Sequence, residues 1–121
     1  MNILVLENGA LIEKDIKNDL RSLQREIGGL VEIVSSLDDF TQQKIVLLVN
    51  EEGKCENNPV PQLVIAHEIY IADILVGKVV FVGYDGSEDF CSLSNEQISF
   101  VKSKLNKKIA YKGKMVYVID Q

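Results

Sequence analysis

Residues 78–105 read KVVFVGYDGSEDFCSLSNEQISFVKSKL, and they decide the fold of this chain. They begin with an apolar, β-branched run at residues 78–84, which is typical of a strand. After a polar loop, Ser94 stands where the N-cap of a helix is expected, and Gln97 stands three residues later, where its side chain can reach back to the cap. This capping box predicts that the strand is followed by a helix at about 95–106.

The predicted helix has an apolar stripe and a basic end. Ile98, Val101 and Leu105 recur at helical spacing and are expected to face the core. Positive charge is favoured near the C-terminal end by the helix dipole. The lysines that gather there are Lys102, Lys104, Lys107 and Lys108.

A second, shorter helix is predicted at about 19–27. Asn18 or Asp19 can cap its first turn, and Gly28 stands where a helix commonly ends in the left-handed conformation. The apolar residues of this segment recur at i, i+3 and i+7, as in an amphipathic helix. They are Leu20, Leu23 and Ile27.

The other apolar runs predict strands. Asn8-Gly9 between the first two is a strong hairpin signal, and the first half of residues 63–86 is ambiguous between a helical turn and a strand. Both prolines fall in ENNPVPQ, residues 56–62, which predicts a surface loop that interrupts the sheet. The further strands are expected at residues 2–6, 10–16, 30–37, 44–50 and 114–120.

These elements favour one fold class. The strands do not alternate regularly with helices, as a parallel α/β sheet would require. A chain of 121 residues can bury one core, and no repeat or break in composition suggests a second domain. We therefore predict a single α+β domain, residues 1–121, with a strand-rich mixed or antiparallel sheet and two short-to-medium helices.

The charge is divided unevenly along the chain. The net charge is −5, yet residues 1–101 carry 7 Lys and Arg against 17 Asp and Glu, whereas residues 102–114 carry 6 Lys and no acid. A nucleic-acid binder normally shows a basic face and a high pI, and here the pI is about 4.8. Direct nucleic-acid binding is therefore not expected. No apolar run approaches the roughly 20 residues that cross a bilayer, so no membrane association is expected either.

The cysteines suggest a reducing compartment. Cys55 and Cys91 are too few and too far apart for a disulfide framework or a zinc pair, and the first residues lack the features of a signal peptide. We expect a cytosolic protein without a cofactor or a metal.

His67 is the only histidine. An enzyme would need a nucleophile such as Cys91 or Ser92 within hydrogen-bond reach of it, and no catalytic motif surrounds these residues. A structural histidine is the simpler interpretation, and we expect no enzymatic activity. A small enzyme that uses His67 remains a second alternative.

The loop YDGSED, residues 84–89, is rich in carboxylates. Hard cations bind such clusters, but the register of a calcium loop is missing, and turns and helix starts use the same residues. Together with two glutamates after an earlier strand, these carboxylates are candidates for steering a basic partner. The candidate partner-binding residues are Asp85, Glu88, Asp89, Glu51 and Glu52.

The basic segment offers an alternative, phosphate-binding site. Tyr111 or Tyr84 would stack on a base beside it. The competing interpretation is that the lysines complement the helix end and protect an edge strand. The candidate phosphate ligands are Lys102, Lys107, Lys108, Lys112 and Lys114.

Several segments between about Asp19 and Lys104 carry a family resemblance. They are LQREIGGLVEIV, LLVNEEGK, NNPVP, YIADILVGKVVFVG and EDFCSLSNEQ. In this order and spacing the chain resembles a family of small uncharacterised proteins, a domain of unknown function, carried by bacteriophages and mobile elements of bacteria. The segment LVIAHEIYIAD departs from relatives that look more polar and arginine-bearing.

The resemblance implies no catalytic residue, but it implies a setting, the bacterial host cytoplasm. Small acidic proteins of mobile elements often act by binding, so the expected function is a non-enzymatic inhibitor that binds a host defence protein. The alternative is a small-molecule or nucleotide-binding protein that sequesters its ligand.

Overall fold

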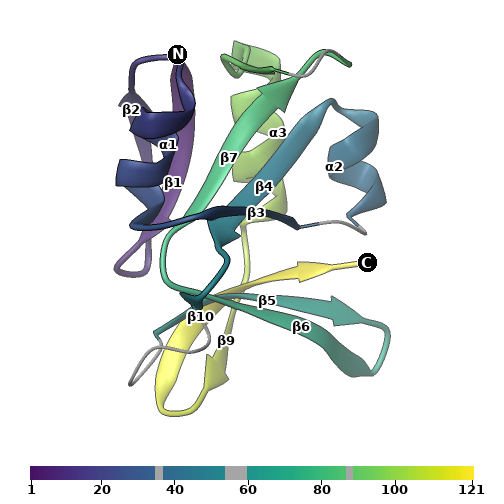
Figure 1. Cartoon of the computed structure of the whole chain (residues 1–121). Coiled ribbons are helices and arrows are strands. Elements are labelled where there is room, and N and C mark those ends of the chain that lie inside the picture. Colours follow the sequence, from purple (N-terminus) through teal and green to yellow (C-terminus); the bar gives the residue numbers. More distant parts are fainter. Residues whose placement is uncertain (35–36, 54–59, 87–88) are drawn as a thin grey trace.

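The computed structural model describes residues 1–34, 37–53, 60–86 and 89–121, and it has the α+β fold predicted from the sequence (Figure 1). Within these ranges, two sheets pack with three helices. In chain order the elements are β1 (Asn2–Glu7), β2 (Ala10–Asp15), α1 (Leu20–Ile27), β3 (Val31–Val34), α2 (Asp38–Gln42), β4 (Ile45–Asn50), β5 (Pro61–His67), β6 (Tyr70–Val76), β7 (Val79–Tyr84), β8 (Phe90–Cys91), α3 (Asn95–Lys104), β9 (Lys108–Tyr111) and β10 (Lys114–Asp120).

The first sheet, sheet A, is antiparallel throughout. Its strand order is β2-β1-β7-β4-β3, and β8 pairs with the end of β7. The apolar run of residues 78–84 forms β7, which lies between β1 and β4, so its residues Val79 to Gly83 are all buried. Asn8 and Gly9 both adopt positive φ, 51° and 75°, and join β1 to β2 as the sequence predicts.

The second sheet, sheet B, is mixed. Its order is β6-β5-β10-β9, with β5 and β10 parallel and the other pairs antiparallel. The parallel pairing begins at Leu63 and Tyr117. The ambiguous first half of residues 63–86 is thus an antiparallel hairpin, and its turn contains Glu68 with φ 54°.

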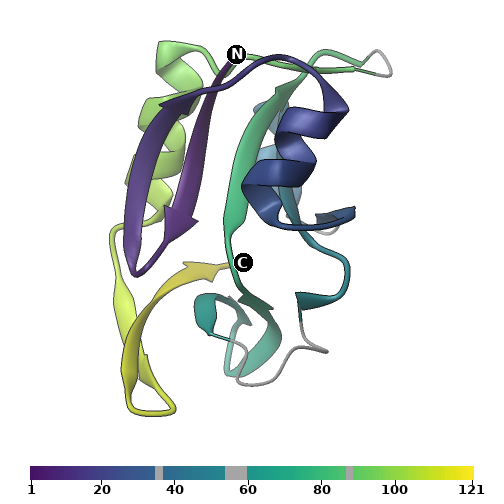
Figure 2. The ribbon, with the colours of Figure 1, turned by 60° about the vertical axis from the view of Figure 1, so that its left-hand side comes forward.

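Sheet A separates two hydrophobic cores. Figure 2 shows α1 and α3 on opposite sides of this sheet. The core on the α1 side consists of Ile3, Val5, Leu23, Ile27, Leu48, Val80 and Val82. The larger core, on the other side, joins sheet A to α2, α3 and sheet B, and its residues include Leu4, Phe40, Leu47, Leu63, Ile65, Phe81, Val101, Leu105 and Ile119.

The helix caps predicted from the sequence are confirmed. Of the two candidates for the first helix, Asp19 is the N-cap, and its side chain accepts a hydrogen bond from Ser22 N at 2.7 Å, which lowers the pKa of that carboxyl group. At α3, Ser94 Oγ accepts from Gln97 N at 3.1 Å and Gln97 Oε1 accepts from Ser94 N at 2.8 Å. Both bonds of the predicted capping box are therefore present.

Several finer predictions are corrected. Leu20 stands in the first turn of α1 and is 59% exposed, so the predicted stripe contributes only its other two residues to the core. Helix α3 ends at Lys104, and Lys108 begins a strand, so it does not extend the helix. Pro61 opens β5, where a strand tolerates proline in its first position, although it was expected in a loop.

The short helix α2 was not predicted. It has five residues, and no side chain caps its N-terminal residue Leu37, so the usual start signal is missing. Phe40 anchors it, because this ring is buried and lies 5.2 Å from the ring of Phe100 in α3, centroid to centroid.

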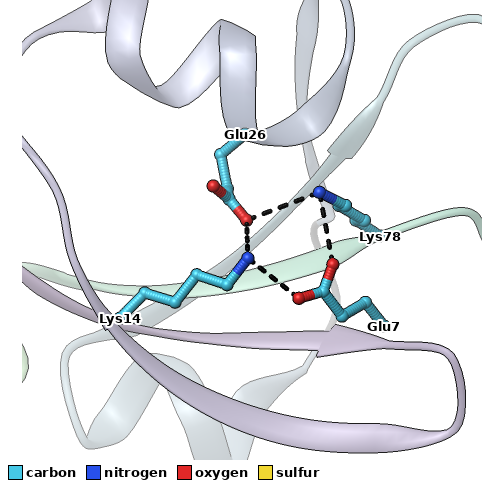
Figure 3. A network of polar contacts seen from close by, with 4 residues as sticks. All are labelled: Glu7, Lys14, Glu26 and Lys78. Atoms are coloured by element: carbon cyan, nitrogen blue, oxygen red, sulfur yellow. Dashed lines mark hydrogen bonds and ion pairs between the residues drawn. The ribbon is translucent and has the colours of Figure 1, made fainter.

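An ion-pair network fixes α1 to sheet A (Figure 3). Lys14 Nζ lies 2.8 Å from a carboxylate oxygen of Glu7 and 2.7 Å from one of Glu26, and Lys78 reaches the same two carboxylates at 3.2 and 3.6 Å. The hydrogen bond to Glu26, followed by that to Glu7, raises the pKa of Lys14. The ammonium groups of Lys14 and Lys78 thus alternate with the carboxylates of Glu7 and Glu26 at the C-terminal end of α1.

Candidate functional site

A groove of about 640 Å³ lies on the outer face of sheet B, between β6 and the tip of the β9–β10 hairpin. This volume is within the range of small-molecule sites. Beneath the outer face, Val64, Val116 and Val118 form a small buried cluster that is separate from the main core. The apolar lining of the groove comes from Val60, Pro61, Ile71, Ile74 and Val76.

One side of the groove is aromatic and basic. Tyr111, Lys112 and Lys114 line it from the β9–β10 hairpin. Lys112 and Gly113 turn the chain with positive φ, 48° and 79°, as in a two-residue hairpin turn, and this turn pairs Tyr111 with Lys114 across the two strands. Directly opposed residues of a hairpin point to the same face, so the ring and the ammonium group face the groove together.

The two lysines of the groove are available for a ligand. In the part of the chain that the structure describes, neither Lys112 nor Lys114 has an ion-pair partner. The Nζ atom of Lys112 lies 5.5 Å from the centroid of the Tyr111 ring, which is a cation–π distance. One carboxylate, that of Asp73, also lines the groove, and it accepts a hydrogen bond from Ile74 N at 2.7 Å.

A β-bulge shapes the opposite side. The register of β6 shifts between the pairs Ile65–Asp73 and Ala66–Ile71, so Ala72 has no direct partner on β5. A bulge of this kind bends a strand and re-aims its side chains. Consecutive residues from Ile71 to Ile74 consequently line the groove, although strict alternation would turn every second one away.

The other lysines of the predicted phosphate set lie elsewhere and are engaged. Lys102 pairs with Glu13 at 2.9 Å, and Lys107 lies 3.6 Å from an oxygen of Asp120. Lys108 donates to the backbone oxygen of Gly9 at 3.2 Å and stands over an aromatic ring of β10. Of the five predicted phosphate ligands, only Lys112 and Lys114 therefore line the groove.

The predicted acidic set is also divided. Glu51 and Glu52 follow β4, whereas Asp85 and Asp89 lie between β7 and β8. Because β4 and β7 are antiparallel neighbours, these two pairs of carboxylates stand at opposite ends of sheet A. Glu88, like Cys55, lies outside the described residues.

The proposed catalytic partners are not brought together. His67 stacks edge-on against Tyr70 at 5.5 Å between ring centroids and lines a small cavity with residues of α2 and the end of β10. Cys91 pairs with Gly83 in β8, and Ser92 Oγ accepts a hydrogen bond from Asn2 N at 2.6 Å. Figure 1 shows that the end of β7, with which β8 pairs, lies far from the β5–β6 turn.

The thiol of Cys91 has the properties of a structural cysteine. Burial raises its pKa, and the carboxylate of Asp85 raises it further. A nucleophilic cysteine needs the opposite shift, because the thiolate is the reactive form. Cys91 is therefore a poor nucleophile in this structure.

The described residues contain neither a candidate metal cluster nor a helix that could cross a membrane. Among them, no group of three or more His, Cys, Asp and Glu side chains could hold a metal ion. None of the helices in this part of the chain has the length and apolar character needed to span a bilayer.

Comparison with protein families assigns the chain. The family model described as domain of unknown function DUF3846 matches residues 1–106. The chain belongs to the DUF3846 family. No curated protein and no solved structure matches it. The predicted resemblance to a domain of unknown function is confirmed.

The DUF3846 match has a boundary that matters for the groove. It includes sheet A, the three helices of the described chain, and β5 and β6, and it ends before β9. The lining residues of β5 and β6 therefore lie inside the matched region, and Tyr111, Lys112 and Lys114 lie outside it. The basic side of the groove therefore lies beyond the matched region.

Sequence reasoning found Tyr111, Lys112 and Lys114 but missed the other side of the groove. Ile71 and Ile74 are ordinary strand residues, and no motif marks them as lining a cavity. The only local signal was that residues 70–76 are mostly apolar although they include the charged residue Asp73.

Proposed function

We propose that the protein is a non-enzymatic binding protein that sequesters a small anionic molecule with a flat or apolar part, and that a nucleotide is the ligand class that fits best. The observation that carries this proposal is the groove of about 640 Å³ with apolar walls, an aromatic ring and two lysines without ion-pair partners in the described chain. This proposal extends the alternative function inferred from the sequence, that of a protein that binds and sequesters a small molecule or nucleotide.

The chemistry of the groove suits the two parts of a nucleotide. A base can stack on Tyr111, and such stacking contributes about 1–3 kcal/mol per base in other proteins. Lys112 and Lys114 supply charged donors for phosphate oxygens. The body of the protein is acidic, so the attraction is local to the groove and should weaken with salt.

The described residues that line the groove form no catalytic constellation, which supports binding over turnover. Among them, the titratable side chains are one carboxylate, one phenol and two ammonium groups. The carboxylate of Asp73 is already used in a hydrogen bond to the backbone. His67 and Cys91 line other parts of the molecule.

The test is calorimetric titration of the protein with a panel of nucleotides at low salt. Lys112→Gln combined with Lys114→Gln should weaken binding roughly tenfold or more, because each charged hydrogen bond is worth about 1.5–3 kcal/mol. Lys102→Gln is the matched control, since it removes an ammonium group outside the groove. If no nucleotide binds to the parent protein, or the control weakens binding equally, the proposal fails.

A second candidate function is inhibition of a host protein by a phage or mobile-element product, as the sequence suggests. Its support is the outer edge of β3, which has no strand partner in the described chain. Ile33 on β3 is 54% exposed and the preceding Leu30 is 57% exposed. An exposed apolar edge strand can pair with a strand of another protein.

The two candidates are separable by mutation. Ile33→Lys should abolish capture of a stoichiometric bacterial partner in a pull-down and leave nucleotide binding unchanged. The double lysine variant of the groove should do the reverse. Loss of partner capture in both variants would count against an interface at β3.

A further inference from the structure

The groove continues into a second compartment. A cavity of about 370 Å³ lies between the β1–β2 turn and the first residues of β5 and β10. It shares Val60, Pro61 and Lys114 with the groove, so Lys114 stands where the two compartments meet. Each compartment alone is large enough to hold a small molecule or a bulky part of one.

The splaying of two strands creates this second compartment. β5 and β10 are paired only from Leu63 and Tyr117 onward, and the residues before these points line the cavity. They include Gln62 on β5 and Met115 on β10, of which Met115 is exposed. The compartment therefore has an apolar side chain on one wall and a carboxamide on another.

Gln62 presents a hydrogen-bond donor to this cavity. It is only 6% exposed, and its Oε1 accepts a hydrogen bond from Gly9 N at 3.1 Å. That bond orients the carboxamide, and its NH₂ group has no hydrogen-bond partner among the residues that the structure describes. No fully buried side-chain nitrogen or oxygen in the described chain lacks a hydrogen-bond partner, so this NH₂ group opens to the cavity, where an acceptor on a ligand can reach it.

We propose that the ligand has two bulky ends, one in each compartment, joined by an anionic linker at Lys114, which is the chemistry of a dinucleotide. One base stacks on Tyr111 in the groove. The second base lies against Met115, and one of its edge acceptors takes a hydrogen bond from the Gln62 amide. The linking phosphate meets Lys114 between them. This inference rests on the proposed nucleotide-binding function and names the ligand more closely.

The experiment compares AMP with the linear dinucleotide ApA by calorimetric titration under the same buffer and salt. The parent protein should bind ApA about tenfold tighter than AMP, a difference of about 1.4 kcal/mol. Gln62→Glu keeps an oxygen for Gly9 N and removes the free donor, so it should abolish the preference for ApA and leave the affinity for AMP unchanged. Should Gln62→Glu fail to fold, Met115→Glu tests the same compartment from an exposed position.

The outcomes separate this inference from the function on which it rests. Equal affinities for AMP and ApA, or a preference that survives both variants, overturn the two-compartment ligand while nucleotide binding stands. Binding of neither compound by folded parent protein overturns both. A preference for ApA that both folded variants lose supports the inference.

Discussion

The side chain of Gln97 on α3 is hydrogen-bonded to the backbone of Gln43, the residue directly after α2, with 2.9 Å between Nε2 and the carbonyl oxygen. The same Nε2 donates to the carbonyl oxygen of Lys44 at 3.1 Å, while Oε1 accepts from Ser94 N. One carboxamide therefore caps α3 and ties it to the connection between α2 and β4.

Ser94→Ala removes the oxygen that accepts from Gln97 N. We expect the free energy of unfolding to fall by about 1 kcal/mol, as is usual for N-caps, which lowers the melting temperature by a few degrees. Thermal and chemical denaturation measure this, with Ser99→Ala on the exposed side of α3 as the control. Ligand affinity of the folded variant should equal that of the parent, and a large loss of affinity would contradict our assignment of Ser94 to the cap alone.

Gln97→Glu separates the two roles of this side chain. The carboxylate still accepts from Ser94 N but has no donor for the carbonyl oxygens of Gln43 and Lys44. We expect a loss of about 1–3 kcal/mol in the free energy of unfolding at pH 7. The loss should shrink toward pH 4, because a protonated carboxyl group can donate again. A loss that does not change with pH would argue against this explanation.

Glu7 should make stability depend on acid pH. The hydrogen bond from Lys14 lowers its pKa, against the effect of burial, and Lys78 lowers it further. A carboxyl group with a lowered pKa stabilises the fold above its unfolded pKa, about 4.3, and this contribution is lost as the pH falls through the folded pKa. Urea denaturation between pH 7 and pH 3 should therefore show a smaller decline for Glu7→Gln than for the parent.

The control for this pH dependence is Glu51→Gln, which removes an exposed carboxylate. It should decline with pH like the parent protein. Parallel curves for the parent and Glu7→Gln would show that the network in Figure 3 does not set the acid stability.

Gly83 leaves no space for a side chain. A Cβ atom at this position would lie 2.8 Å from the backbone oxygen of Ser92 and 2.9 Å from Sγ of Cys91. Gly83→Ala should therefore displace β8 from β7 and cost roughly 1–3 kcal/mol of stability, as overpacked substitutions do. Chemical denaturation tests this, and a variant as stable as the parent would show that β8 moves away at little cost.

Local signals in the sequence were sufficient for much of the fold. The caps at Asp19 and Ser94 and the turn at Asn8 were predictable because each depends on residues within a few positions. The division into two sheets depends on the pairing of β5 with β10, whose residues are distant in the sequence, and no local pattern specifies it. The helix α2 was missed because one buried ring, that of Phe40, holds it in place of a cap.

The candidate site was only half predictable, for a related reason. Tyr111, Lys112 and Lys114 were recognisable by their chemistry. The bulge at Ala72 and the splayed start of β5 are products of strand pairing, and they bring apolar residues and Gln62 to the ligand side without any motif. Proximity in the sequence also misled the prediction of the phosphate ligands. The lysines from 102 to 108 were grouped with those of the groove, but partners on other elements hold them elsewhere.

The parallel pairing of β5 with β10 also imposes an order on biosynthesis. The ribosome releases the β5–β6 hairpin well before β10, which is the neighbour that β5 needs on its other side. Until β10 emerges, the apolar side chains of Leu63, Val64 and Ile65 lack the cover that they have in the finished protein. Non-local pairing of this kind folds slowly and exposes a nascent chain to aggregation. A growing chain that has completed sheet A would thus still have an incomplete sheet B, and it would acquire its groove only after β9 and β10 have emerged.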